Sequence, residues 1–421
     1  MTYWVGAILV GFVAVVFASI ANLIAQWQKE LIHTNAWIML ALSPAGLALS
    51  IWLTRNYFKG AQGSGIPQVI ASLHMSDMKT VDQILALKTA LGKILLTLLG
   101  LACGASIGRE GPTCQVGASL LHNFGQLGKV TAIGARRSLI LAGGAAGVAA
   151  AFNTPLGGIV FAIEELSHSF EQKTTGTVLA AVVISGVTTI ALIGNYSYFG
   201  HANVGLPVGV EWLGIMACSI LGGISGGLFS RILITTSKGL PGKIGGWLNR
   251  HPVSFAALCG LVLAMIGLIS HGTTYGTGYE QAKEIVIGDA HYPASFFIFK
   301  FLATIVSYCS GIPGGIFAPS LAIGAGLGGW VAQFFPHATV GTLVLLGMVA
   351  YFSAVVQSPL TAAVIVMEMT DNQQILLALL ATSFAAYGIS SFISHPLYSS
   401  LAKNMLAVQE HPAVSPSLPK P

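Results

Sequence analysis

Charged residues are scarce in this sequence: only 8% of its 421 residues are Asp, Glu, Lys or Arg. A soluble globular domain carries about 25% of such residues, and its surface depends on them. Apolar residues, in contrast, make up 54% of the chain. This composition excludes a cytosolic enzyme and a disordered protein, and it predicts an all-α polytopic membrane protein.

Charges are absent over stretches long enough to cross a bilayer. Five windows contain none: residues 2–27, 31–54, 138–163, 174–210 and 301–367. A membrane-spanning helix needs about 20 largely apolar residues, so most windows hold at least one span and the longest holds several. The first window is too long for a cleaved signal peptide and no basic residue precedes it, so we expect the first membrane helix there.

Signals of metal, nucleotide or covalent chemistry are missing as well. The five cysteines stand singly in apolar stretches, as small buried side chains do, and none of the 11 histidines has zinc-site spacing. The glycine string at 324–329 matches a dinucleotide-binding pattern, but no strand precedes it and helix packing explains it. The sequence therefore predicts no cofactor, no metal, no ATP-driven step and no intramembrane enzyme. The formal charge of +5 does not suggest nucleic acid binding.

Four short segments with proline interrupt the apolar stretches, and glycine, which is abundant in the chain, gathers in three of them. The four segments are Gly63-Ser64-Gly65-Ile66-Pro67, Gly108-Arg109-Glu110-Gly111-Pro112, residues 311–319 (GIPGGIFAP) and His395-Pro396-Leu397-Tyr398. An apolar run with helical spacing follows each one, and proline is tolerated in the first turn of a helix. We expect helices that begin within the membrane.

Helices that begin within a membrane expose N–H groups that have no partner inside the helix. Such groups survive in a bilayer only against protein or a water-filled cavity. The free N–H donors and the partial positive charge at a helix N-terminus suit an anion. Several such starts in one chain therefore predict a shared anion pathway, a device known from secondary transporters.

The chain also contains an internal repeat. Residues 153–164 (NTPLGGIVFAIE) align with 357–368 (QSPLTAAVIVME), and Pro112 aligns with Pro319 at nearly the same offset. We predict one membrane repeat over residues 1–205, a second over 206–405 and a short tail over 406–421. The sequence indicates a repeat without showing whether the halves are inverted.

These motifs resemble those of the CLC chloride channels and transporters. The resemblance rests on GSGIP at 63–67, GREGP at 108–112 and GIFAP at 315–319, in that order, and extends over roughly residues 10 to 405. It implies two inverted repeats of tilted and broken helices, and a homodimer with one pathway in each subunit. Because the chain ends soon after Tyr398, we expect a prokaryotic-type member without cytoplasmic regulatory domains.

The resemblance also implies an anion site. Ser64 and Tyr398 would hold chloride with their hydroxyls, the N–H groups of Ile316 and Phe317 would donate to it, and Gly108 belongs to the same site. Neutral donors suit chloride, because conduction needs weak binding. Taken alone, Ser64 would be a helix N-cap and Tyr398 an interfacial anchor.

Two glutamates are implied to gate the pathway and carry protons: Glu110 on the outer side and Glu165 on the inner side. A carboxylate deep in a bilayer costs about 3 kcal/mol unless it has a favourable site, and the helix start after Glu110 provides one. The alternatives are an ion pair with Arg109 and, for Glu164, a solvated helix end. Glu368 mirrors Glu164 in the second half, where we expect a structural role.

Together these features predict a secondary transporter in the inner (plasma) membrane that exchanges chloride for protons. A passive voltage- or pH-gated chloride channel of the same fold is the alternative. Gln68 stands where many relatives carry an acid, so no role of that acid is expected here.

Overall fold

The computed structural model describes residues 2–167, 172–194, 196–200, 212–239, 248, 250–288, 293–335 and 338–410. In these ranges the chain is helical and its only β-type pairing consists of two isolated bridges. The predicted all-α class is confirmed. The first half contains α1 (Thr2–Asn35), η1 (Ala36–Ile38), α2 (Met39–Asn56), α3 (Ile66–His74), α4 (Met78–Ile84), α5 (Leu87–Ala102), α6 (Glu110–Leu127), α7 (Ile133–Phe152), α8 (Pro155–Phe161), the π-helical turn η2 (Ala162–Ser167) and α9 (Gln172–Ile193).

The second half begins with α10 and ends with the helix that carries Tyr398. Its helices are α10 (Trp212–Ser237), α12 (Pro252–Ile269), α13 (Tyr279–Ile287), α14 (Ser295–Cys309), α15 (Phe317–Ala332), α16 (Val340–Val356), α17 (Pro359–Thr370), α18 (Leu376–Ser391) and α19 (Leu397–Glu410). The predicted boundary near residue 205 lies outside the described residues, as do residues 411–421 of the predicted tail.

Among the described residues, five helical segments are long and apolar enough to cross a bilayer. They are Tyr3–Asn56, Met78–Ala102, Gly176–Ile193, Trp212–Ser237 and Pro252–Ile269. The first contains the predicted first membrane helix. Several further apolar helices are shorter, among them α15 at 16 residues and α17 at 12. An α-helix rises about 1.5 Å per residue, so these helices reach only part of the way across a hydrocarbon core of about 30 Å.

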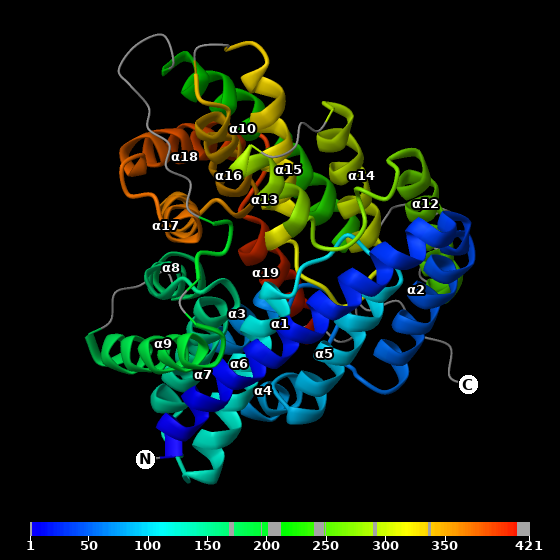
Figure 1. The fold of residues 1–421 in the computed structure, drawn as a ribbon. Helices are drawn as coiled ribbons and strands as arrows, with labels where there is room; N and C mark the ends of the chain where they lie inside the picture. The colour runs from blue at the N-terminus through cyan, green and yellow to red at the C-terminus, as the bar shows by residue number, and fades with distance from the viewer. Residues whose placement is uncertain are drawn as a thin grey trace.

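The helices of the two halves pair in the same way. In the first half α7 packs against α6 and α9, and in the second half α16 packs against α15 and α18. Figure 1 shows α3 to α9 in the lower part of the view and α10 to α18 in the upper part, with α19 in red between them. The halves meet where α2 contacts α12 and where α8 contacts α17. Helix α19 contacts α3 of the first half and α10 and α16 of the second.

Two reciprocal pairs of hydrogen bonds join α17 to α8 and to the turn η2 that follows it. The Glu164 carboxylate accepts from the N–H groups of Leu360 (3.1 Å) and Thr361 at the start of α17. The Glu368 carboxylate accepts from those of Leu156 (3.1 Å) and Gly157 at the start of α8. Each glutamate thus caps the helix of the opposite half, and reciprocal contacts of this kind indicate a local two-fold relation. The structural role expected for Glu368 fits this geometry, and Glu164 has the same one.

Glycines allow the closest helix contacts. A Cβ atom on Gly324 of α15 would lie 2.6 Å from the Gly347 carbonyl oxygen of α16, and one on Gly117 of α6 would overlap the Gly143 carbonyl of α7. The glycine string at 324–329 is therefore a packing surface, as predicted. Four of the five cysteines are buried and Cys309 is half-buried.

Candidate anion site

All four proline-containing segments start a helix, as the sequence predicts. Helix α3 begins at Ile66, α6 at Glu110, α15 at Phe317 and α19 at Leu397. The residues before α3, α6 and α15 are buried inside the protein. The first N–H groups of a helix have no acceptor within it, so these starts bring free donors into the interior.

Backbone hydrogen bonds hold three of these starts together. The N–H of Gly314 donates to the Gly63 carbonyl (3.0 Å). Gly108 and Gly315 exchange two bonds: the Gly108 N–H donates to the Gly315 carbonyl at 2.7 Å and the Gly315 N–H to the Gly108 carbonyl at 2.8 Å. The starts of α3, α6 and α15, which belong to both halves of the sequence, therefore surround one common point.

Glycine is required where the loops approach each other most closely. Gly65, the N-cap of α3, has a φ of 102°, in the region that side chains avoid. A Cβ atom on it would also lie 2.8 Å from the Gly111 carbonyl oxygen of α6. The conformation and the space both demand a residue without a side chain.

The predicted hydroxyl pair lies at this point. Ser64 and Tyr398 are 1% and 0% exposed, and their hydroxyls lie close to each other. Neither hydroxyl has a hydrogen-bond partner of normal geometry in the described part of the chain. The Tyr398 ring stacks on that of Phe317, with the ring centroids 6.0 Å apart. Buried polar groups are normally paired, so two unpaired hydroxyls near helix N-termini provide donors for a hydrogen-bond acceptor.

The Glu110 carboxylate lies in the same cluster. Glu110 is fully buried, and its Oε1 atom accepts a hydrogen bond from the Tyr198 hydroxyl (3.3 Å). The carboxylate lies against Gly108 and close to the N–H groups of Glu110 itself and Ala318. It therefore lies at the N-termini of both α6 and α15, where a negative charge is favoured.

Arg109 does not form the alternative ion pair with Glu110. Its Nη1 atom donates instead to the Ala18 carbonyl and the Asn22 side-chain oxygen of α1, both at 2.9 Å. The guanidinium thus ties α1 to the start of α6 and leaves the carboxylate free to face the N–H groups.

Glu165 lies apart from Glu110, in the π-helical turn η2 that follows α8. It is 2% exposed, and the Ser358 hydroxyl donates to its Oε2 atom, while Oε1 has no partner in the described ranges. Tyr398, one of the two hydroxyl residues of the cluster, is close enough for its hydroxyl to interact electrostatically with Glu165. The two glutamates therefore face the cluster from different elements.

Two buried lysines, neither of them singled out from the sequence, bind backbone carbonyls in the loops before α3 and α13. Lys93 of α5 is fully buried, and its ammonium donates to the carbonyls of Gln62 (3.2 Å) and Gly63 (2.9 Å). Lys300 of α14 is also fully buried and donates to the carbonyls of Thr274 (2.9 Å) and Gly276 (2.8 Å), just before α13. A charge inside an apolar helical run was the available signal: Lys300 is the one charged residue of α14, and Lys93 shares α5 with Lys88.

Gln68 also serves the loop before Ser64. Its side-chain amide donates to the Gln62 carbonyl, which Lys93 binds as well. Gln68, which stands where many relatives carry an acid, thus has a structural contact in this chain.

No group of three His, Cys, Asp or Glu side chains arranged for a metal ion occurs among the described residues.

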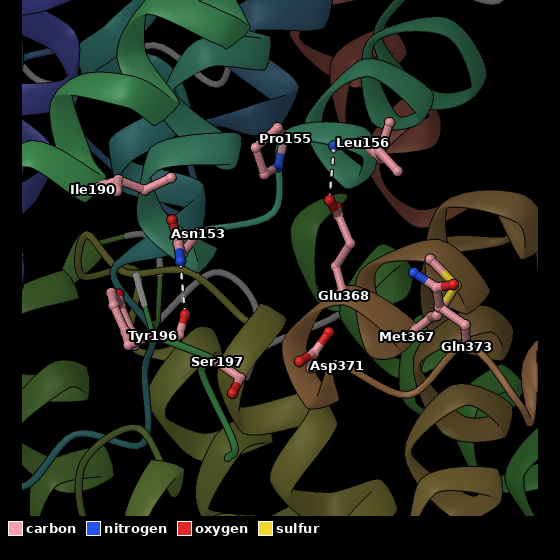
Figure 2. A pocket seen from close by; sticks show the side chains of 10 residues that line it. All are labelled: Asn153, Pro155, Leu156, Ile190, Tyr196, Ser197, Met367, Glu368, Asp371 and Gln373. Carbon is pink, nitrogen blue, oxygen red and sulfur yellow. Dashed lines mark hydrogen bonds between the residues drawn. The ribbon is translucent and has the colours of Figure 1, made fainter. Parts of the chain in front are cut away.

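A pocket of about 420 Å³ lies beside the start of α8 and the end of α17. Figure 2 shows Glu368 reaching from α17 to the Leu156 N–H and, across the pocket, Asn153 donating to the Tyr196 carbonyl. The second bond is 2.7 Å long and holds the segment that leads to Tyr198. The pocket contains none of the predicted site residues.

Comparison with known proteins gives a consistent result. Residues 45–391 match the family model described as voltage gated chloride channel. The structure is similar to that of a slow cyanobacterial Cl⁻/H⁺ antiporter, at 28% identity and a TM-score of 0.82, over 97% of this chain and 99% of that one. It is also similar to a CLC-type fluoride/proton antiporter (22% identity, TM-score 0.79, 95% and 96% covered). A eukaryotic CLC transporter matches at 20% identity with a TM-score of 0.74, over 96% of this chain and 74% of that one. The chain is a multi-pass membrane protein that belongs to the CLC family of chloride channels and transporters.

Proposed function

We propose that this protein exchanges chloride for protons across a membrane. The observation that carries the proposal is the Glu110 carboxylate, buried at the N-termini of two broken helices and next to two unpaired hydroxyls. The similar cyanobacterial structure, which is that of a Cl⁻/H⁺ antiporter, supports this assignment.

Chloride is held by neutral donors in this proposal. The hydroxyls of Ser64 and Tyr398 and the N–H groups of Ile316 and Phe317 surround the central ion, and the loop at Gly108 bounds the site on the outer side. No cationic side chain needs to touch the ion, and the buried ammonium of Lys93 is engaged by two carbonyls. Binding by dipoles is weak enough to let a large, weakly hydrated anion leave.

Proton coupling follows from competition between Glu110 and chloride. The ionised carboxylate takes the N–H groups of α6 and α15 and excludes an anion from them. Protonation removes its charge and with it the main attraction to the helix starts, so the side chain leaves and chloride enters. Protonation of Glu110 is thereby linked to the movement of chloride.

Glu165 supplies the inner proton-transfer step. It is buried and carries one carboxylate oxygen without a partner in the described ranges, and Ser358 orients the other. We expect the proton to cross from there to Glu110 through water, past Tyr398. A passive voltage- or pH-gated chloride channel would need no such acid, and the buried Glu165 is the observation that favours exchange.

Assembly and location form part of the same proposal. Family membership supports a homodimer with a separate pathway in each subunit, embedded in lipid of the inner (plasma) membrane. Chloride and protons are its substrates. We infer a transporter and not an enzyme, with no cofactor and no nucleic acid partner.

Flux measurements in liposomes test the proposal. A chloride gradient imposed on purified, reconstituted protein is expected to drive protons uphill. Glu110→Ala should keep chloride flux and abolish proton movement, while Glu165→Gln should slow protons and leave chloride binding intact. Chloride flux without proton movement in the unmodified protein would establish the channel alternative instead.

A further inference from the structure

Among the described residues, Tyr198 is the side chain that donates a hydrogen bond to the Glu110 carboxylate. Its hydroxyl donates to the Oε1 atom at 3.3 Å, and the residue is 2% exposed. The tyrosine comes from the segment after α9, far from Glu110 in the sequence. Nothing in the motifs of the sequence pointed to it.

The segment that carries Tyr198 is fixed from three sides. Asn153, which directly follows α7, donates to the Tyr196 carbonyl at 2.7 Å (Figure 2). The Phe199 N–H donates to the Met369 carbonyl of α17 at 2.8 Å, and the Tyr279 hydroxyl of α13 donates to the Tyr198 carbonyl at 2.8 Å. Helices from both halves therefore set the position of this loop over the start of α6.

Aromatic rings then fix the direction of the phenol. The Tyr198 ring packs edge-on against Phe152, Phe199 and Tyr279, at centroid distances of 5.6, 5.0 and 4.8 Å. Phe152 in turn contacts Phe317 at 5.6 Å, the ring that stacks on Tyr398. Since these rings enclose the phenol and leave it little freedom to turn, its hydroxyl is directed to the carboxylate.

The charged and titratable groups around Glu110 come from few elements. Arg109 on its own helix is engaged by α1, and α15 contributes backbone N–H near the carboxylate. From the loop and α13 come Tyr198, with Tyr196 and Tyr279 behind it. Among the described residues, the Tyr198 phenol is thus the side chain whose donated hydrogen bond favours the ionised form of Glu110 over the protonated form.

We propose that Tyr198 is a latch: a positioning residue whose hydroxyl holds the ionised Glu110 side chain on the helix N-termini and so sets the pH at which the pathway opens. This inference rests on the gating role proposed for Glu110. A donated hydrogen bond favours the charged form of a carboxylate, so its removal makes protonation easier. Transport then continues to higher pH than in the unmodified protein.

The test is the pH dependence of chloride transport by Tyr198→Phe in liposomes. The substitution removes one oxygen atom and keeps the aromatic packing. The bond to Glu110 is long, at 3.3 Å. Loss of such a hydrogen bond to a charged group corresponds to a shift of about one unit in the pH of half-maximal transport. We expect that shift toward higher pH, about tenfold faster transport on the alkaline side, and unchanged proton-to-chloride stoichiometry.

Two variants separate the latch from a general effect of losing a hydroxyl. Tyr279→Phe removes the bond to the Tyr198 carbonyl and should shift the profile in the same direction by a smaller amount. Tyr275→Phe removes a buried hydroxyl that donates to the Ala264 carbonyl (3.1 Å) in another cluster and should shift nothing.

An unshifted or acid-shifted profile in a folded Tyr198→Phe protein would overturn the latch. If Glu110→Ala still abolished proton coupling, the proposed exchange would stand without it. A shift in Tyr275→Phe as large as in Tyr198→Phe would also overturn it. If Tyr198→Phe does not fold, an unshifted profile in folded Tyr279→Phe has the same consequence.

Discussion

Neutralising Glu110 should strengthen chloride binding, because its carboxylate occupies a position at the starts of α6 and α15 that an anion could otherwise take. Glu110→Gln keeps the size of the side chain and removes its charge. A negative charge gains about 1 kcal/mol at a helix N-terminus, and the carboxylate faces two of them, α6 and α15. If chloride recovers this interaction, its Kd should fall about 30-fold, which corresponds to about 2 kcal/mol.

Isothermal titration of purified protein with chloride measures this change. Glu368→Gln is the matched control, since that carboxylate also accepts from two N–H groups at a helix start, that of α8. We expect the control to lower the melting temperature and leave chloride affinity unchanged. Equal affinity in Glu110→Gln and the unmodified protein, with both folded, would refute the competition between carboxylate and chloride.

Three further outcomes are expected. Lys93→Met should weaken chloride binding severalfold in the same titration, because it frees the carbonyls before Ser64. Lys300→Met frees the carbonyls before α13 and should reduce stability only. Equal chloride affinities in the two variants would contradict this. Gly65→Ala should destabilise the protein by more than about 1 kcal/mol, seen as a lower melting temperature in detergent, because its positive φ and the neighbouring Gly111 carbonyl both oppose a side chain. Ser358→Ala should slow proton flux and spare chloride binding, since it removes the donor to Glu165; unchanged proton flux would exclude that role.

The sequence predicted the helix starts because glycine and proline have local effects. Gly65 can adopt its φ of 102° because glycine has no side chain, and the proline in the first turn of α3 favours a helix start. Both effects are local and do not depend on tertiary contacts. The repeat likewise predicted Glu164 and Glu368 as counterparts, although it could not indicate that each caps the helix of the other half.

Tyr198 and Lys93 could not be assigned from the sequence, because their roles depend on tertiary contacts. Tyr198 lies in a connecting segment with no motif, and the bonds from Asn153, Tyr279 and the Phe199 backbone bring it to Glu110. Lys93 differs from a snorkelling lysine in that two carbonyls lie within its reach. The domain boundary near residue 205 stays a prediction.

Anomalous diffraction from crystals grown in bromide locates the anions that the protein binds. We expect a peak among the Ser64 and Tyr398 hydroxyls and the first N–H groups of α15. A second peak is expected at the position of the Glu110 carboxylate once that residue is changed to Gln. Bromide density elsewhere in the membrane region, with none beside Tyr398 and Phe317, would contradict the assignment of this cluster as the anion site.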